Sequence, residues 1–192
     1  VFEDGVVLAA TRSTPKLQVR NPEKVFKIDD HLGASNSGLV ADGRVLVEDA
    51  RLEAQKNMMT YDEPVPVYTL AKFLADRKQM FTQYGGVRPF GTAMLVGGVN
   101  EEAKVFQTDP SGNLSEWKAV AIGRGSDEVN NLFSDEYEES MSKEEAIKLA
   151  VKALGKAEED LEIENIELAV IQKGERFKRY TPEELEDADV EL

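Results

Sequence analysis

Two uninterrupted apolar segments constrain the fold of this chain more than any other feature. Residues 93–99 read AMLVGGV and residues 168–171 read LAVI. A strand with one face in water alternates apolar and polar residues, whereas a strand covered on both faces is apolar throughout. We therefore expect sheets that are buried on both sides by further layers of structure.

The order of the remaining segments indicates how those layers are built. Strands are expected at 6–10, 25–28, 32–35, 92–99, 104–108, 117–123, 166–171 and 176–180, and helices at 39–57, 67–81, 129–137 and 142–154, with a short helix after Thr181. Groups of strands that alternate with pairs of helices do not give the βαβ rhythm of a doubly wound sheet. The order favours an α+β fold, a four-layer αββα sandwich of two antiparallel sheets between helix pairs, formed as a single domain over residues 1–192.

Several local signals support these boundaries. Ser142 with Glu145, and Thr181 with Glu184, have the spacing of a capping box at the start of a helix. The stretch Asp109-Pro110-Ser111-Gly112 has proline and glycine where a turn needs them, which predicts a hairpin between the strands on either side.

Charge and cysteine content exclude several classes of function. The chain has 37 acidic and 23 basic side chains, a net charge of −14. Such an excess repels phosphate backbones and anionic lipids, so neither nucleic acid nor a membrane is expected as the main partner. The absence of cysteine excludes disulfides, thiolate metal sites and a cysteine nucleophile, and it fits a cytoplasmic protein. No apolar run reaches the length of about 18 residues that a membrane span needs.

Residues 83–91, QYGGVRPFG, form a shaped break between two apolar segments. Paired glycines permit a positive φ and close backbone approach, and Pro89 biases Arg88 toward an extended conformation. Such a break suits either a ligand loop or a structural turn, and the stretch alone does not decide between them.

Other candidate sites are weak. His31 is the only histidine, and no nucleophile-elbow pattern accompanies it, so we interpret it as a turn residue. The glycines around Arg124 lack the remainder of a phosphate loop. The acidic run at 158–164 is typical of a solvated helix end. We expect no metal and no cofactor.

Five stretches together carry a family resemblance. They read EKVFKIDDHLGASNSGLVADGRVLVEDARLEAQ (23–55), MTYDEP (59–64), QYGGVRPFG (83–91), QTDPSGNLSEWKA (107–119) and AIGRGS (121–126). In this order and spacing the chain resembles archaeal 20S proteasome α subunits from residue 1 to about 185. The resemblance implies a noncatalytic subunit of a heptameric outer ring, which stacks on β subunits, frames the substrate gate, docks a regulatory ATPase activator and admits unfolded proteins. It implies that Gly85, Gly86, Arg88 and Pro89 shape a joint.

The same resemblance raises an alternative, because the catalytic β subunits share this fold. They are amino-terminal nucleophile hydrolases, in which a terminal threonine attacks and its own α-amine accepts the proton. This sequence starts with Val1. Four positions of the β-subunit active site have counterparts here by the resemblance. An acidic residue corresponds to Thr11, a lysine to Lys24, a serine to Arg124 and a second acidic residue to Glu167. We expect no catalytic residue, and the alternative is a threonine-type hydrolase.

For α subunits, the resemblance assigns an activator-docking pocket to Lys24, Gly38 and Leu39. A compact ammonium in a cleft can bind the terminal carboxylate of an activator, and backbone amides at a helix start add positive potential. The alternative is a surface lysine in an exposed ion pair.

The resemblance also has one departure. Family members carry a Tyr-Asp-Arg gate segment, a helix and a strand before the region that matches residues 4–10. Without those residues we expect that the chain cannot close a pore by itself. Either an upstream segment has been removed or is disordered, or a processed amino terminus is itself functional.

Overall fold

Two antiparallel sheets form the centre of the computed structural model, which describes residues 1–12, 17–18, 22–188 and 190. The three-stranded sheet has the order β1 (Gly5–Thr11), β7 (Ile166–Gln172), β8 (Lys178–Tyr180). The five-stranded sheet has the order β2 (Val25–Asp29), β3 (Leu32–Gly38), β4 (Thr92–Val99), β5 (Ala103–Thr108), β6 (Leu114–Trp117). Neighbouring strands in both sheets are antiparallel, as predicted.

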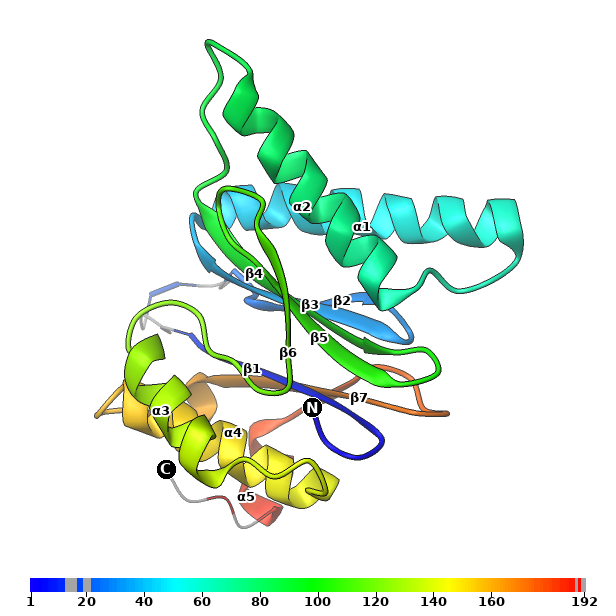
Figure 1. Ribbon diagram of the computed structural model, residues 1–192. Coiled ribbons are helices and arrows are strands. Elements are labelled where there is room, and N and C mark those ends of the chain that lie inside the picture. Colours follow the sequence, from blue (N-terminus) through cyan, green and yellow to red (C-terminus); the bar gives the residue numbers. More distant parts are fainter. Residues whose placement is uncertain (13–16, 19–21, 189, 191–192) are drawn as a thin grey trace.

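Helices cover the outer face of each sheet (Figure 1). The helices are α1 (Val40–Tyr61) and α2 (Val67–Gln83) over the five-stranded sheet, α3 (Ser126–Glu136) and α4 (Lys143–Ala157) over the three-stranded sheet, the 3₁₀ turn η1 (Ile163–Asn165) and the short α5 (Pro182–Asp187). The predicted four-layer αββα sandwich is therefore confirmed. No helix in the described part of the chain is long and apolar enough to cross a bilayer.

The position of strand β4 between a helix layer and the opposite sheet explains why its sequence is apolar without interruption. Met94 and Val96 pack beneath α1 and α2, whereas Leu95 and Val99 face the other sheet. Each fully buried aliphatic side chain stabilises the fold by about 1.5–3 kcal/mol. Both faces of β4 therefore contribute to the core, because one packs against the helix layer and the other against the opposite sheet.

The two sheets approach closely at Gly97. A Cβ atom built there would lie 2.7 Å from Val6 Cγ1 of the opposite sheet. Real side chains do not pack at that distance, so any larger residue would force the sheets apart.

One predicted strand is wrong. Of the predicted strand 117–123 only Trp117 is in a strand, because β6 pairs with β5 from Leu114 to Trp117 and ends there. The following residues leave the ladder, and Val120 and Ile122 pack against the core between the two sheets. Their alternation with small residues reflects this packing and not a hydrogen-bonded strand.

Smaller differences concern element ends. Helix α1 continues to Tyr61 and ends where Asp62 adopts a left-handed φ of 55°. Helix α3 stops at Glu136, so Tyr137 is its C-terminal cap and not part of its face. Strand β8 covers only Lys178–Tyr180 of the predicted 176–180. Both predicted capping boxes are present, at the starts of α4 and α5.

Candidate functional site

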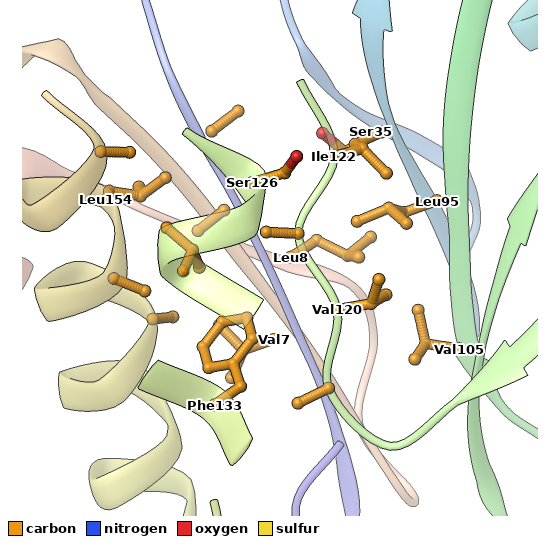
Figure 2. Close-up of a pocket in the computed structure, with 18 of the residues that line it drawn as sticks. Val7, Leu8, Ser35, Leu95, Val105, Val120, Ile122, Ser126, Phe133 and Leu154 are labelled. Atoms are coloured by element: carbon orange, nitrogen blue, oxygen red, sulfur yellow. The ribbon is translucent and has the colours of Figure 1, made fainter. Parts of the chain in front are cut away.

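A cleft of about 540 Å³ runs beside β1 (Figure 2). Residues of both sheets line one side of it, and residues of helices α3 and α4 line the other. All residues from 6 to 12 line it. Successive side chains of a strand point to opposite faces, so a cavity that touches every one of them lies along the strand edge. In Figure 2, Leu8, Leu95 and Val105 line the side toward the five-stranded sheet, and Phe133 and Leu154 line the helix side.

The charges along the cleft are mostly positive. Arg12, Lys24, Lys118 and Arg124 line it, whereas Glu158 is the acidic residue among its lining residues. This basic cleft lies in a chain with a net charge of −14. A cavity with several cations and apolar walls favours a ligand that is apolar and carries carboxylates.

Lys24 directly precedes β2, and its backbone is fixed from two sides. The buried carboxylate of Glu167 in β7 accepts hydrogen bonds from the amides of Lys24, at 2.9 Å, and Val25, at 3.0 Å. The Lys24 carbonyl accepts from the Asn36 amide at 3.2 Å. Within the described part of the chain, the Lys24 ammonium itself has no hydrogen bond or ion pair. Lys24 is half-buried, and it lines the cleft without a counterion among the residues that the structure describes.

Gly38 and Leu39 lie where β3 passes into α1, at the same end of the sheet as Lys24. Gly38 has a φ of 115°, and a Cβ atom there would lie 2.4 Å from the Gly91 carbonyl oxygen, which requires glycine. The Leu39 amide donates to the same carbonyl at 2.9 Å. Leu39 caps the start of α1, and half of its surface is exposed. The structure therefore places these two residues at a helix start that lies near Lys24.

The segment QYGGVRPFG is tied to the start of α1 through Arg88. Its guanidinium makes two bonds of 2.8 Å to the two carboxylate oxygens of Asp42, and Asp42 also accepts from the Gly91 amide at 2.7 Å. The hydrogen bonds from Arg88 hold the pKa of the Asp42 carboxyl below its usual value. Arg88 also donates to the carbonyl of Pro89.

The tip of this segment has a different character. Gly85 and Gly86 are exposed, and nothing lies within 4 Å of a Cβ atom built at either position. Gly86 has a φ of 83°. The loop projects away from the body of the molecule after α2 (Figure 1). The segment therefore combines an anchored base at Arg88 with an open tip.

The positions that match a hydrolase site are only partly brought together. Thr11, Lys24 and Arg124 line the same cleft, and Glu167 contacts the Lys24 backbone. His31 is not among the lining residues; its Nε2 lies 2.9 Å from the Val65 carbonyl oxygen. Glu167 is bound to two backbone amides, so its carboxylate already has a structural role.

Sequence comparison identifies the family. The profile of the family described as "Proteasome subunit" matches residues 1–171. The chain belongs to the proteasome subunit family. It is 55% identical over 186 residues to "Proteasome subunit alpha" of Thermococcus sibiricus, with 95% of this chain and 72% of that protein covered. It is 51% identical over 187 residues to the α subunit of Pyrococcus abyssi, covering 96% and 72%. For Archaeoglobus fulgidus the identity is 48% over 187 residues, covering 95% and 76%.

These similarities support an archaeal proteasome α subunit, a kind of protein that forms rings with other proteasome subunits. The αββα sandwich is consistent with the fold of that family. Thr11 and Lys24 line the cleft, and Glu167 binds the Lys24 amide, so these three residues lie at one end of the two sheets.

Sequence reasoning missed one buried functional group. Lys78 in α2 is fully buried, and its ammonium donates to the carbonyls of Thr92 and Thr108 and to the Thr108 hydroxyl, at 2.7–3.1 Å. Leu70, Leu74 and Lys78 recur at intervals of four residues on the apolar stripe of the helix. A lysine in that stripe was the available signal. Burial lowers the pKa of Lys78 to about 8, although the nearby Asp109 carboxylate opposes the shift.

Proposed function

We propose that the chain is a noncatalytic α subunit that joins identical subunits in a heptameric outer ring on proteasome β subunits. In this ring it frames the entry for unfolded proteins and docks a regulatory ATPase. The relatives named "Proteasome subunit alpha" support the subunit type. The observation that carries activator docking is the Lys24 ammonium, which lines the cleft and has no counterion among the described residues, at the end of the sheet where β3 passes into α1.

The noncatalytic role is supported by the residues in the hydrolase-like positions. Thr11 lies within the chain at the end of β1, so it has no free α-amine to accept its proton. By the family resemblance, Arg124 is at the position where a hydrolase of this fold has a serine. The Glu167 carboxylate is bound to the Lys24 and Val25 amides, so it fixes the backbone.

The docking role follows from the charge of Lys24. An ammonium at the edge of a cleft can form a charge-assisted hydrogen bond to the terminal carboxylate of an activator tail. The helix start at Leu39 adds the positive end of the α1 dipole. Asp42 in the first turn does not cancel this field, since its carboxylate is paired with Arg88.

Substitution of Lys24 in the assembled particle tests the docking role. Removing one partner of a desolvated charge pair costs about 2–5 kcal/mol, and the lower end applies here because Lys24 is only half buried. We expect Lys24→Ala to weaken activator binding about 30-fold per tail and to abolish ATPase-stimulated protein degradation. Assembly and basal hydrolysis of short peptides should stay unchanged.

Two variants control for charge and position. Lys24→Arg keeps the charge and changes its shape, so partial rescue indicates charge and no rescue indicates pocket geometry. Lys27→Ala removes a lysine of the adjoining strand β2 that already pairs with Asp30, and it should leave stimulation intact. Full stimulation of the Lys24→Ala particle by the ATPase would exclude the docking role.

A further inference from the structure

The segment QYGGVRPFG supplies one of two charged side chains around the start of α1. Residues 36–43, which end β3 and begin α1, and residues 85–91 of the segment contain Asp42 and Arg88 and no other charged residue. Lys24 lies at the same end of the sheet, since its carbonyl accepts from the Asn36 amide. A ligand that binds at the helix start beside Lys24 therefore also meets the charges of Asp42 and Arg88.

Asp42 is bound to the crossing segment and not to its own helix. A carboxylate at the third helical position often folds back onto the N-cap amide. Here the amide of the N-cap residue Leu39 donates to the Gly91 carbonyl at 2.9 Å. The Asp42 carboxylate instead accepts from the Gly91 amide at 2.7 Å, and each of its oxygens accepts from Arg88 at 2.8 Å.

The first turn of α1 consequently keeps free donors. Among the described residues, no side chain caps this helix start, and the amides of Val40 and Ala41 have no hydrogen-bond acceptor. Both residues are exposed. Free amides at the start of a helix favour an anion, and an unpaired carboxylate in the same turn opposes one.

Arg88 is placed to remove that opposition. Its side chain is 61% exposed, whereas the Asp42 side chain beneath it is 12% exposed. A Cβ atom built at Gly91 would lie 2.7 Å from Leu39 Cδ1 and 3.4 Å from Arg88 Nη1, so the guanidinium also lies beside Leu39. The fork of two bonds thus neutralises the carboxylate of the first turn next to the residue that begins the helix.

We propose that Arg88 sets the strength of activator docking by neutralising Asp42. With the pair intact, an incoming carboxylate meets the free amides of α1 and the Lys24 ammonium without a competing negative charge. The inference rests on the proposed docking of an activator tail at Lys24, and it gives the segment QYGGVRPFG a part in that function. Arg88 acts through Asp42 and does not need to touch the ligand.

Three variants of the assembled particle change the charge at the helix start in a defined order. Arg88→Met lowers it by one, Asp42→Asn raises it by one, and the double variant restores the wild-type value. The measured quantity is the concentration of regulatory ATPase that gives half-maximal stimulation of protein degradation. We expect it to rise about fivefold in Arg88→Met, to fall about fivefold in Asp42→Asn, and to return to within about twofold of the wild type in the double variant.

Asp42→Asn separates a charge effect from a mechanical one. An asparagine can still accept from the Gly91 amide, but it loses the ion pair with Arg88. If the pair served only to hold the segment against α1, Asp42→Asn would weaken docking and the double variant would not recover. Either result would overturn the proposal. The effect of Arg88→Met relative to the wild type should also shrink as ionic strength rises, and a ratio that salt does not change would contradict a role of charge.

Two further variants test position and shape. Arg51→Met removes an arginine that pairs with Glu48 further along α1, and it should leave the half-maximal concentration unchanged. Arg88→Lys keeps the charge without the fork and should lie close to the wild type. Assembly and basal hydrolysis of short peptides show whether each particle is intact. If Arg88→Met does not assemble, the sign of the Asp42→Asn effect decides.

Lys24→Ala in the same assay distinguishes failure of this inference from failure of the docking function. If Lys24→Ala abolishes stimulation while Arg88→Met and Asp42→Asn behave as the wild type, docking stands and the role of Arg88 is wrong. If the Lys24→Ala particle is fully stimulated, the docking function is wrong and the role of Arg88 falls with it.

Discussion

Replacing Lys78 by methionine removes a fully buried charge from the interface between α2 and the five-stranded sheet. The ammonium is surrounded by the carbonyls of Thr92 and Thr108 and by the Thr108 hydroxyl, which favour its charged form. Burial has the larger effect and lowers the pKa of Lys78 from 10.5 to about 8. Stability should therefore depend on pH through this residue.

The sign and size follow from the two pKa values. The unfolded chain holds the proton up to about pH 10.5, whereas the folded protein releases it above about pH 8. The unfolded state thus binds more protons between these values, and the free energy of unfolding rises with pH in that window. A shift from 10.5 to about 8 makes the Lys78 contribution about 3 kcal/mol larger at pH 10.5 than at pH 7.

Urea unfolding at a series of pH values measures this contribution. Other lysines and the tyrosines titrate in the same range, so the relevant quantity is the difference between the wild type and Lys78→Met. We expect that difference to change by about 3 kcal/mol in favour of the wild type from pH 7 to pH 10.5. Lys56→Met, at an exposed lysine of α1, is the control and should give a constant difference. Parallel curves for wild type and Lys78→Met would refute the lowered pKa.

Two further predictions concern the start of α1 and the question of catalysis. Gly38→Ala should destabilise the fold by more than about 2 kcal/mol, because the added Cβ meets the Gly91 carbonyl oxygen. Gly86→Ala, also at a positive φ but in open space, should cost only about 1 kcal/mol. Thermal unfolding compares the two variants, and equal losses of stability would contradict the steric argument. The isolated chain should hydrolyse no fluorogenic peptide above background, and turnover that Thr11→Ala abolishes would show a catalytic subunit instead.

The sequence predicts the layers well because burial determines which positions of a strand or helix are apolar. Strand β4 is covered on both faces and reads as a continuous apolar run, and the two capping boxes define the starts of α4 and α5. The strand prediction failed at residues 118–123 because packing between the sheets gives Val120 and Ile122 the same alternation as a strand. Periodicity reports which side chains are buried, and it does not report which backbone is paired.

The site was less accessible to sequence reasoning, because its contacts join distant parts of the chain. Glu167 holds the amide of Lys24 across 143 positions, and Arg88 reaches Asp42 across 46. Neither pairing has a local pattern. The roles of Lys24, Gly38 and Leu39 came from the family resemblance and remain predictions. The cleft is lined by residues from several elements, which no single segment encodes.

The contacts of Glu167 give a residue at a hydrolase-like position a structural role. A carboxylate that is buried without partners is costly, and Glu167 avoids that cost by accepting from the amides of Lys24 and Val25. Its loss would leave two amides unpaired where β2 begins beside β7. The same contact fixes the backbone from which the Lys24 ammonium extends. The proposed docking role of Lys24 would therefore use a backbone position that Glu167 fixes.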